Sequence, residues 1–131
     1  MAVSYTERTI EALTTLGYDV GIVERYIANA WHAKGRGVRK DLFGFIDLIA
    51  MRPGEGIIGV QSTGPDYSGH NKKIVTECRE KAIKWLKSGG RLELWAWRKV
   101  LVKKGGKLKM YKPRIKKYTL EDFREVPKCQ R

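Results

Sequence analysis

The sequence predicts a single α/β domain over residues 1–131, with helices flanking a mixed central β-sheet. Its length of 131 residues is the usual size of one domain with one hydrophobic core. Hydrophobic residues make up 42% of the chain, which is enough for a packed interior and argues against disorder. Segments with helical spacing alternate with short apolar runs. Their order is helix, strand hairpin, helix, strand, strand, as in a mixed α/β domain.

Two segments have the apolar spacing of amphipathic helices. In residues 4–16 apolar side chains recur at helical intervals, with Ser4 as the expected N-cap and Glu7 at the capping-box position. In residues 71–87 an apolar stripe is surrounded by lysine and glutamate. We therefore expect one continuous helix in each segment, and a loop over residues 64–71.

Runs of β-favouring residues separated by turn residues predict four strands. A turn centred on Gly54 joins the first two, and the lysine- and glycine-rich residues 103–107 join the last two. Residues 18–30 fit either a strand or a helix. Residues 34–40 hold two glycines and four cations and predict a flexible basic loop. The four strands are expected over residues 43–51, 57–63, 91–102 and 108–118.

The charge of the chain is the first clue to its function. Lysine and arginine number 27 against 14 acidic residues, a formal net charge of +13. Contacts from lysine and arginine to phosphates gain from counterion release, so we expect a nucleic-acid partner. A membrane surface would require a basic amphipathic helix or a lipidation motif, and neither is evident. Cys78 and Cys129 form no metal-ligand spacing or disulfide framework, which favours a cytoplasmic protein with free thiols.

Asp47 is the most informative residue for chemistry. It interrupts an apolar segment, where a carboxylate is costly unless it is paired or bound to a cation. With the turn centred on Gly54, Gln61 lies directly opposite Asp47, and Thr63 shares the face of Gln61. Oxygen ligands of this kind suit Mg²⁺ or Mn²⁺. Alternatively, Asp47 and Gln61 only hydrogen-bond each other, and the residues alone favour neither interpretation.

A family resemblance favours the metal. The pattern Phe-Gly-Phe-Ile-Asp47-Leu-Ile-Ala, a short turn, and then Gly-Ile-Ile-Gly-Val-Gln61-Ser-Thr63 resembles the core of the PD-(D/E)XK nucleases, which have the restriction-endonuclease-like fold. It is most similar to their archaeal and phage Holliday junction resolvase and VRR-NUC-like branches. There the first strand carries Gly-x-x-Asp and the second carries Glu-x-Lys. The resemblance includes Glu7 in the first helix and covers residues 4 to about 102.

The resemblance implies a Mg²⁺- or Mn²⁺-dependent endodeoxyribonuclease that hydrolyses phosphodiester bonds, with branched DNA as its substrate. A resolvase is expected to be a twofold homodimer, because a junction presents two symmetric cleavage points. Glu7 and Asp47 would supply charge to the metal, while Gln61 would add its amide oxygen and Ser62 its main-chain carbonyl. For Glu7, an ordinary helix cap is the competing interpretation.

The chain departs from the family pattern at two positions. Gln61 occupies the position of the family glutamate and contributes no charge, and Thr63 occupies the position of the lysine and has no amine. Two explanations fit. Either a lysine has migrated to the start of the next helix, with Lys72 or Lys73 as candidates, or the protein binds DNA without cutting it. A basic RNA-binding protein is a further alternative, but it would leave the pairing of Asp47 with Gln61 unexplained.

Basic side chains around the predicted site are expected to contact DNA. The glycines of the basic loop would let its backbone approach phosphate closely, and the loop directly precedes the strand of Asp47. A histidine and two lysines that follow the second motif strand are placed to reach the same nucleic acid. The expected contacts are Lys34, Arg36, Arg39, Lys40, His70, Lys72 and Lys73.

Overall fold

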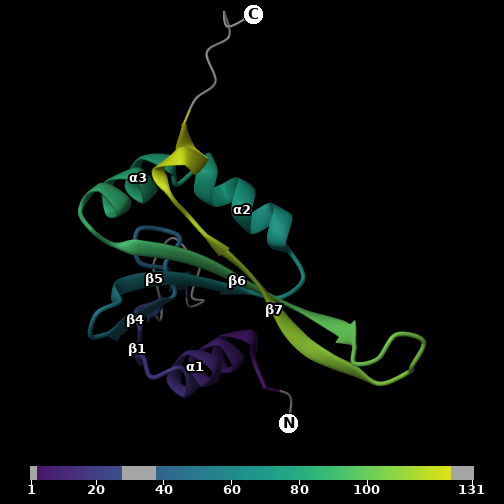
Figure 1. Ribbon diagram of the computed structural model, residues 1–131. Coiled ribbons are helices and arrows are strands. Elements are labelled where there is room, and N and C mark those ends of the chain that lie inside the picture. Colours follow the sequence, from purple (N-terminus) through teal and green to yellow (C-terminus); the bar gives the residue numbers. More distant parts are fainter. Residues whose placement is uncertain (1–2, 28–37, 125–131) are drawn as a thin grey trace, which may run out of the picture.

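The computed structural model describes residues 3–27 and 38–124, so the expected contacts of Lys34 and Arg36 lie outside the described residues. The described chain forms a small α/β domain with helices flanking a mixed sheet, as the sequence predicts; it has three α-helices and five strands in the main sheet. Helix α1 covers one side of the sheet, and helices α2 and α3 cover the other (Figure 1). This three-layer arrangement places the sheet between two apolar cores.

In chain order the elements are α1 (Tyr5–Thr15), β1 (Asp19–Ile22), β2 (Arg25–Ile27), β3 (Val38–Lys40), β4 (Leu48–Arg52), β5 (Gly56–Thr63), α2 (Tyr67–Val75), α3 (Arg79–Lys87), β6 (Arg91–Leu101), β7 (Lys109–Lys117) and the 3₁₀-helix η2 (Leu120–Phe123).

The sheet has the strand order β1-β4-β5-β6-β7. All neighbouring pairs are antiparallel except β5 and β6, which are parallel. A parallel pair needs a crossover connection, and α2 and α3 provide it on one face. Strands β2 and β3 pair separately, outside the main sheet.

Each face of the sheet has its own hydrophobic core. Leu48 and Val60 belong to the core beneath α1, while Ile74 and Leu94 belong to the core beneath α2 and α3. Because side chains alternate along a strand, the residues next to Leu48 and Val60 point to the opposite face. Asp47 and Gln61 therefore lie on the side of α2 and α3.

The predicted first helix and the predicted hairpin register are confirmed. The Ser4 hydroxyl accepts a hydrogen bond from the main-chain N–H of Glu7 at 3.0 Å and caps α1. Leu48 lies opposite Val60, which is the register expected from a turn centred on Gly54. Gly54 has φ +87°, a left-handed conformation that glycine adopts without strain.

The predicted continuous helix over residues 71–87 is wrong. It is two helices, and α2 begins earlier, so most of the expected loop over residues 64–71 is helical. Asp66 explains the early start, because its side chain accepts a hydrogen bond from the main-chain N–H of Gly69 at 3.0 Å and caps α2. The break after Val75 has no glycine or proline to mark it in the sequence.

Two strand predictions also need correction. The strand expected over residues 43–51 begins only at Leu48, because Phe43 and Gly44 form a tight turn with φ +56° and +85°. Residues 38–40 form β3 and are not part of a loop. By contrast, β7 continues through Pro113 as an edge strand, where a missing N–H costs no hydrogen bond within the sheet.

Candidate metal centre

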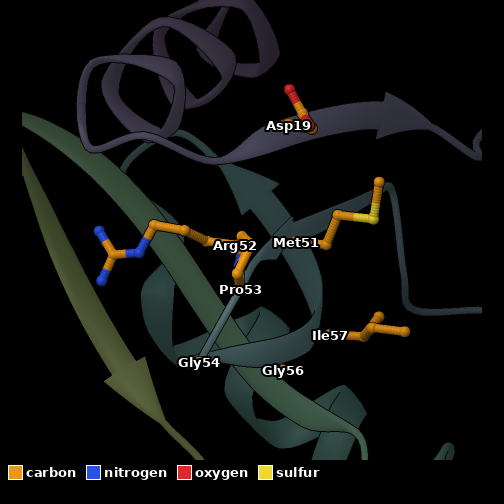
Figure 2. A pocket seen from close by; sticks show the side chains of 7 residues that line it. All are labelled: Asp19, Met51, Arg52, Pro53, Gly54, Gly56 and Ile57. Carbon is orange, nitrogen blue, oxygen red and sulfur yellow. The ribbon is translucent and has the colours of Figure 1, made fainter.

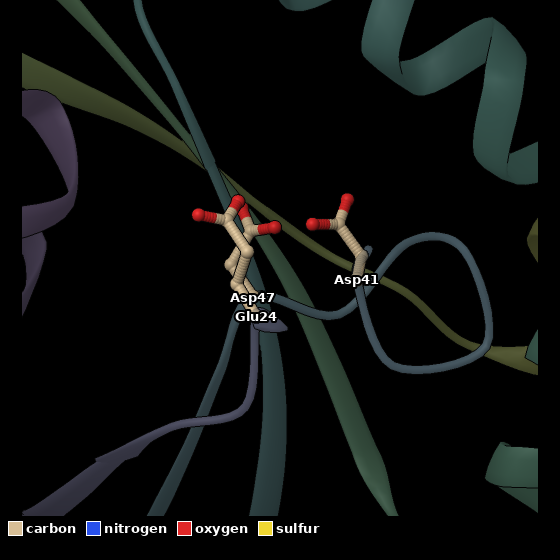
Figure 3. Close-up of side chains that lie close together, drawn as sticks. All are labelled: Glu24, Asp41 and Asp47. Atoms are coloured by element: carbon tan, nitrogen blue, oxygen red, sulfur yellow. The ribbon is translucent and has the colours of Figure 1, made fainter. Parts of the chain in front are cut away.

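Three carboxylates converge beside the start of β4. One carboxylate oxygen from each of Glu24, Asp41 and Asp47 lies within 4.8 Å of the other two. The three side chains come from separate segments of the chain, as Figure 3 shows. Asp47 is buried, and the other two are half-buried. Carboxylates this close repel one another unless a proton or a cation lies between them.

The backbone of Asp47 fixes Glu24 beside it. The Asp47 N–H donates to the carbonyl of Val60 at 2.9 Å, which anchors this residue to β5. The Asp47 carbonyl accepts two hydrogen bonds, from the N–H of Val23 at 2.9 Å and from that of Glu24 at 3.1 Å. The segment after β1 is therefore attached directly to the residue that carries the buried carboxylate.

A tight turn brings Asp41 to the same place. Leu42 and Ile46 exchange two main-chain hydrogen bonds, of 2.8 and 3.0 Å, across the turn formed by Phe43 and Gly44. The chain reverses over Phe43, Gly44 and Phe45, and the positive φ of Phe43 and Gly44 makes this reversal tight. The reversal places Asp41 opposite Asp47.

Gln61 occupies the predicted position and leaves one buried atom without a partner. Its side-chain Nε2 donates to Asp47 Oδ2 at 3.0 Å, and the Ser62 N–H donates to the same oxygen at 2.9 Å. Gln61 is 3% exposed, and its Oε1 has no hydrogen-bond partner within the described residues. Buried amide oxygens are normally satisfied. The unsatisfied oxygen belongs to the same amide that donates to Asp47.

Burial and the neighbouring Asp41 raise the pKa of the Asp47 carboxyl from 3.8 to about 8. The hydrogen bonds from Ser62 and Gln61 act in the opposite direction but do not outweigh them. Without a cation, Asp47 therefore holds a proton at neutral pH. A bound divalent cation would take the place of that proton.

Lys73 lies at the rim of the cluster. Its Nζ is 4.0 Å from Asp41 Oδ2, and the two side chains are 34% and 17% exposed. Lys72 is exposed and makes no ion pair within the described part of the chain. Both lysines lie in the last turn of α2, where the sequence predicted the start of a helix. Of the two candidates for a migrated lysine, the structure brings Lys73 to the carboxylates.

Several predicted site residues lie apart from this cluster. Glu7 is exposed and accepts a hydrogen bond at 3.1 Å from the hydroxyl of Ser4, the residue that caps α1, so it belongs to the first turn of this helix. His70 Nδ1 contacts the carbonyl of Asp66 at 2.9 Å, within α2. Thr63 is half-buried at the end of β5, two residues beyond Gln61. The remaining positions are Arg39 and Lys40, in β3, and Ser62, which presents its N–H to Asp47.

The side chain of Ser62 points away from the cluster and connects β5 to α1 through hydrogen bonds. Its hydroxyl lies 2.8 Å from Thr9 Oγ1 and donates to the carbonyl of Tyr5 at 3.1 Å. Thr9 is fully buried and also accepts a hydrogen bond from Trp97 Nε1 at 2.8 Å. These contacts hold α1, β5 and β6 together, directly beneath the strand end that carries Gln61.

Sequence reasoning missed Glu24 and Asp41. Asp41 and Asp47 flank a Phe-Gly turn symmetrically, with apolar residues between each aspartate and the turn. That symmetry could have indicated their proximity. Glu24 follows β1 in a segment that fits a strand or a helix, and nothing in its pattern signals contact with Asp47.

The hollow at the other end of β4 is remote from this chemistry. It measures about 380 Å³ and lies around the β4–β5 turn, lined by Asp19, Met51, Arg52, Pro53, Gly54, Gly56 and Ile57 (Figure 2). Strands rise about 3.3 Å per residue, so Met51 and Asp47 are separated by more than 10 Å along the strand. We therefore place the functional site at the carboxylates.

Comparisons with known proteins gave no match: no protein-family model, no curated protein and no solved structure corresponds to this chain. None of the helices within residues 3–27 and 38–124 has the length and apolar character needed to cross a membrane. The function is therefore inferred from the site itself.

Proposed function

We propose that the protein is a Mg²⁺- or Mn²⁺-dependent endonuclease on a restriction-endonuclease-like fold, and that it hydrolyses phosphodiester bonds of DNA. The observation that carries this proposal is the meeting of three carboxylates, the most buried of which is hydrogen-bonded to the side-chain amide of Gln61. Branched DNA as substrate and a twofold homodimer are proposed from the family resemblance.

The donor set fits a hard divalent cation. Three carboxylates and an amide oxygen are the oxygen ligands that Mg²⁺ and Mn²⁺ prefer, with no sulfur or imidazole among them. Glu24 and Asp41 take the place expected for Glu7, so the proposed ligands are Glu24, Asp41, Asp47 and Gln61. With three carboxylates, the neutral Gln61 does not leave the cation short of charge.

The topology supports the same fold. An N-terminal helix precedes an antiparallel strand pair, and a helical crossover then leads to a parallel strand. This order agrees with the one that the resemblance implies for the motif strands. Asp47 directly precedes β4, and Gln61 lies near the end of β5. Because the two strands are antiparallel, both motif positions fall at the same end of this strand pair.

The chain's own groups have separable roles in this proposal. A bound cation would polarise the scissile phosphate and lower the pKa of a coordinated water. Gln61 Nε2 and the Ser62 N–H hold one oxygen of Asp47 in place. Lys73, at the rim beside Asp41, supplies the amine that Thr63 cannot, and its Nζ is available to a phosphate oxygen.

A cleavage assay tests the proposal. Linear, nicked and four-way-junction DNA would be incubated with the full chain in Mg²⁺, in Mn²⁺ and in EDTA. We expect cation-dependent cleavage that Asp47→Asn, Asp41→Asn and Glu24→Gln each abolish, while the helix-cap variant Glu7→Gln retains it. Cleavage that survives in the three cluster variants would overturn the assignment. Binding without cleavage under every condition would favour the non-catalytic DNA-binding alternative.

A further inference from the structure

The β6–β7 hairpin extends beyond the sheet as a two-stranded ribbon. Strand β6 pairs with β5 as far as Ala96, which lies opposite Thr63. From Trp97 to Leu101 it pairs with β7 alone. Figure 1 shows this part of the hairpin projecting away from the body of the domain. Isolated two-stranded ribbons are marginally stable in water, so a projecting one is suited to contact a partner.

The β6–β7 hairpin, of which the ribbon is the outer part, carries most of the net positive charge of the protein. Residues 98–117 contain ten lysines and arginines and no acidic residue, whereas the whole chain has a net charge of +13. Arg98 lies directly opposite Lys112, and both side chains are exposed. Neither makes an ion pair with another described residue. Like charges directly opposite on a sheet are destabilising. A bound polyanion would remove that cost.

Protection of the strand edges does not account for this pattern. Charged residues and proline on an edge strand prevent sheets from adding to one another, and β7 has both. That purpose accounts for lysines and a proline on β7, but it does not require the absence of every acidic residue over residues 98–117. Alternating acidic and basic residues would also stabilise the cross-strand pairs. A run of cations alone indicates a negatively charged partner.

One face of the ribbon continues the face that carries the carboxylate site. Thr63, Ala96 and Arg114 lie side by side on β5, β6 and β7, and their side chains share a face with Gln61. Arg98 and Lys112 follow on the same face, two residues further out. We call Arg98, Lys112 and Arg114 the basic face.

Helix α2 connects the basic face to the cluster. The guanidinium of Arg114 lies 3.6 Å above the ring of Tyr67, in the first turn of α2. Lys73, in its last turn, contacts Asp41. Neighbouring strands are about 4.8 Å apart, so Arg114 is roughly 10 Å from Thr63 across the sheet. Gln61 lies two residues, or about 7 Å, from Thr63 along β5, so the basic face and the cluster are close enough for one phosphate backbone to span both.

We propose that the basic face of the β6–β7 ribbon binds duplex DNA and leads its backbone to the carboxylate cluster. The route to the cluster rests on the proposed nuclease function, but the binding itself needs no cation. Two strands about 4.8 Å apart, with their side chains, match the B-form major groove, which is about 12 Å wide and admits a β-ribbon. The deep, narrow major groove of duplex RNA does not admit one.

A matched pair of variants tests the basic face. Arg98→Gln/Lys112→Gln removes two cations from it. Lys99→Gln/Lys109→Gln removes two from the opposite face of the same ribbon, where Lys99 lies 5.4 Å from the ring centre of Tyr111. Fluorescence anisotropy of the full chain with a labelled 30-base-pair DNA duplex would be measured in EDTA at several salt concentrations, so that cleavage plays no part. Circular dichroism would confirm that both variants fold.

We expect the first variant to lose affinity by about tenfold or more, and its log–log salt slope to fall by about 2. The opposite-face variant should lose less than about threefold. Equal losses in the two variants, no loss in either, or equal affinity of the wild type for duplex RNA of the same sequence would overturn the proposal. Asp47→Asn separates the two functions. If it and the wild type bind equally well but neither cleaves, the nuclease proposal fails while the basic face stands.

Discussion

Replacing Asp47 by Asn should change how the stability of the protein depends on pH. Burial and Asp41 raise the pKa of Asp47 in the folded chain to about 8, above its ordinary value of 3.8. Between these two pH values the folded protein holds a proton that the unfolded chain has released. Raising the pH therefore favours unfolding, and the stability of the cation-free protein falls across this range. Asparagine cannot titrate, so Asp47→Asn should remove this contribution.

The size of the effect follows from the linkage of one proton. Each pH unit between about 4 and 8 changes the free energy of unfolding by at most about 1.4 kcal/mol. At pH 5 the folded carboxyl is protonated but the unfolded one is mostly ionised, so linkage alone makes the wild type less stable than Asp47→Asn by about 1.6 kcal/mol, and the altered hydrogen bonds change this by about 1 kcal/mol. At pH 7 and above the variant should be the more stable of the two in EDTA.

Urea unfolding at pH 5, 6, 7 and 8 in EDTA would measure this difference. Asp19→Asn is the matched control, because Asp19 is exposed on β1 and the substitution removes the same charge. Its unfolding free energy should run parallel to that of the wild type. Adding Mn²⁺ at pH 8 should then stabilise the wild type and leave Asp47→Asn unchanged. If the unfolding free energies of the wild type and Asp47→Asn stay parallel from pH 5 to pH 8, Asp47 does not hold a proton in the folded protein and the electrostatic reasoning fails.

Three further substitutions test other parts of the structure. Lys73→Ala should lower the cleavage rate at least tenfold while DNA affinity changes less than threefold. Lys72→Ala should cleave like the wild type. Equal cleavage rates in the two variants would contradict the role given to Lys73. Gly59→Ala should cost about 1–3 kcal/mol in thermal or urea unfolding, because its Cβ would lie 2.8 Å from Ile46 Cδ1. Thr9→Val should cost about 1–3 kcal/mol, since the buried hydroxyl holds two side chains, and a neutral result would show that water replaces it.

The parts of the fold that local patterns determine could be predicted from the sequence. The first helix has a capping serine and a regular apolar stripe, so its start is fixed by residues within one turn of each other. The β4–β5 register follows from a single turn at Gly54, and this register alone predicts that Gln61 lies against Asp47. In both cases the interactions that decide the structure lie close together in the chain.

The carboxylate cluster could be predicted only in part, because it depends on contacts that local patterns do not encode. Asp41 reaches the site through a turn in which Phe43 adopts φ +56°, a conformation rare for a bulky residue. Glu24 is held by hydrogen bonds to the carbonyl of Asp47, far along the chain. Glu7 had the right residue type in the expected helix, yet the cap of that helix occupies its side chain. The local sequence pattern indicates Asp47, but only the three-dimensional fold shows that Glu24 and Asp41 are its neighbours.

The carboxylates around Gln61 explain why a neutral side chain suits this position. A glutamate there would place a fourth carboxylate about 3 Å from Asp47, which already shares its surroundings with Glu24 and Asp41. The amide donates a hydrogen bond to Asp47, where a carboxylate would repel it. A neutral amide at this position is thus what two additional acidic neighbours favour, and it is consistent with cation binding.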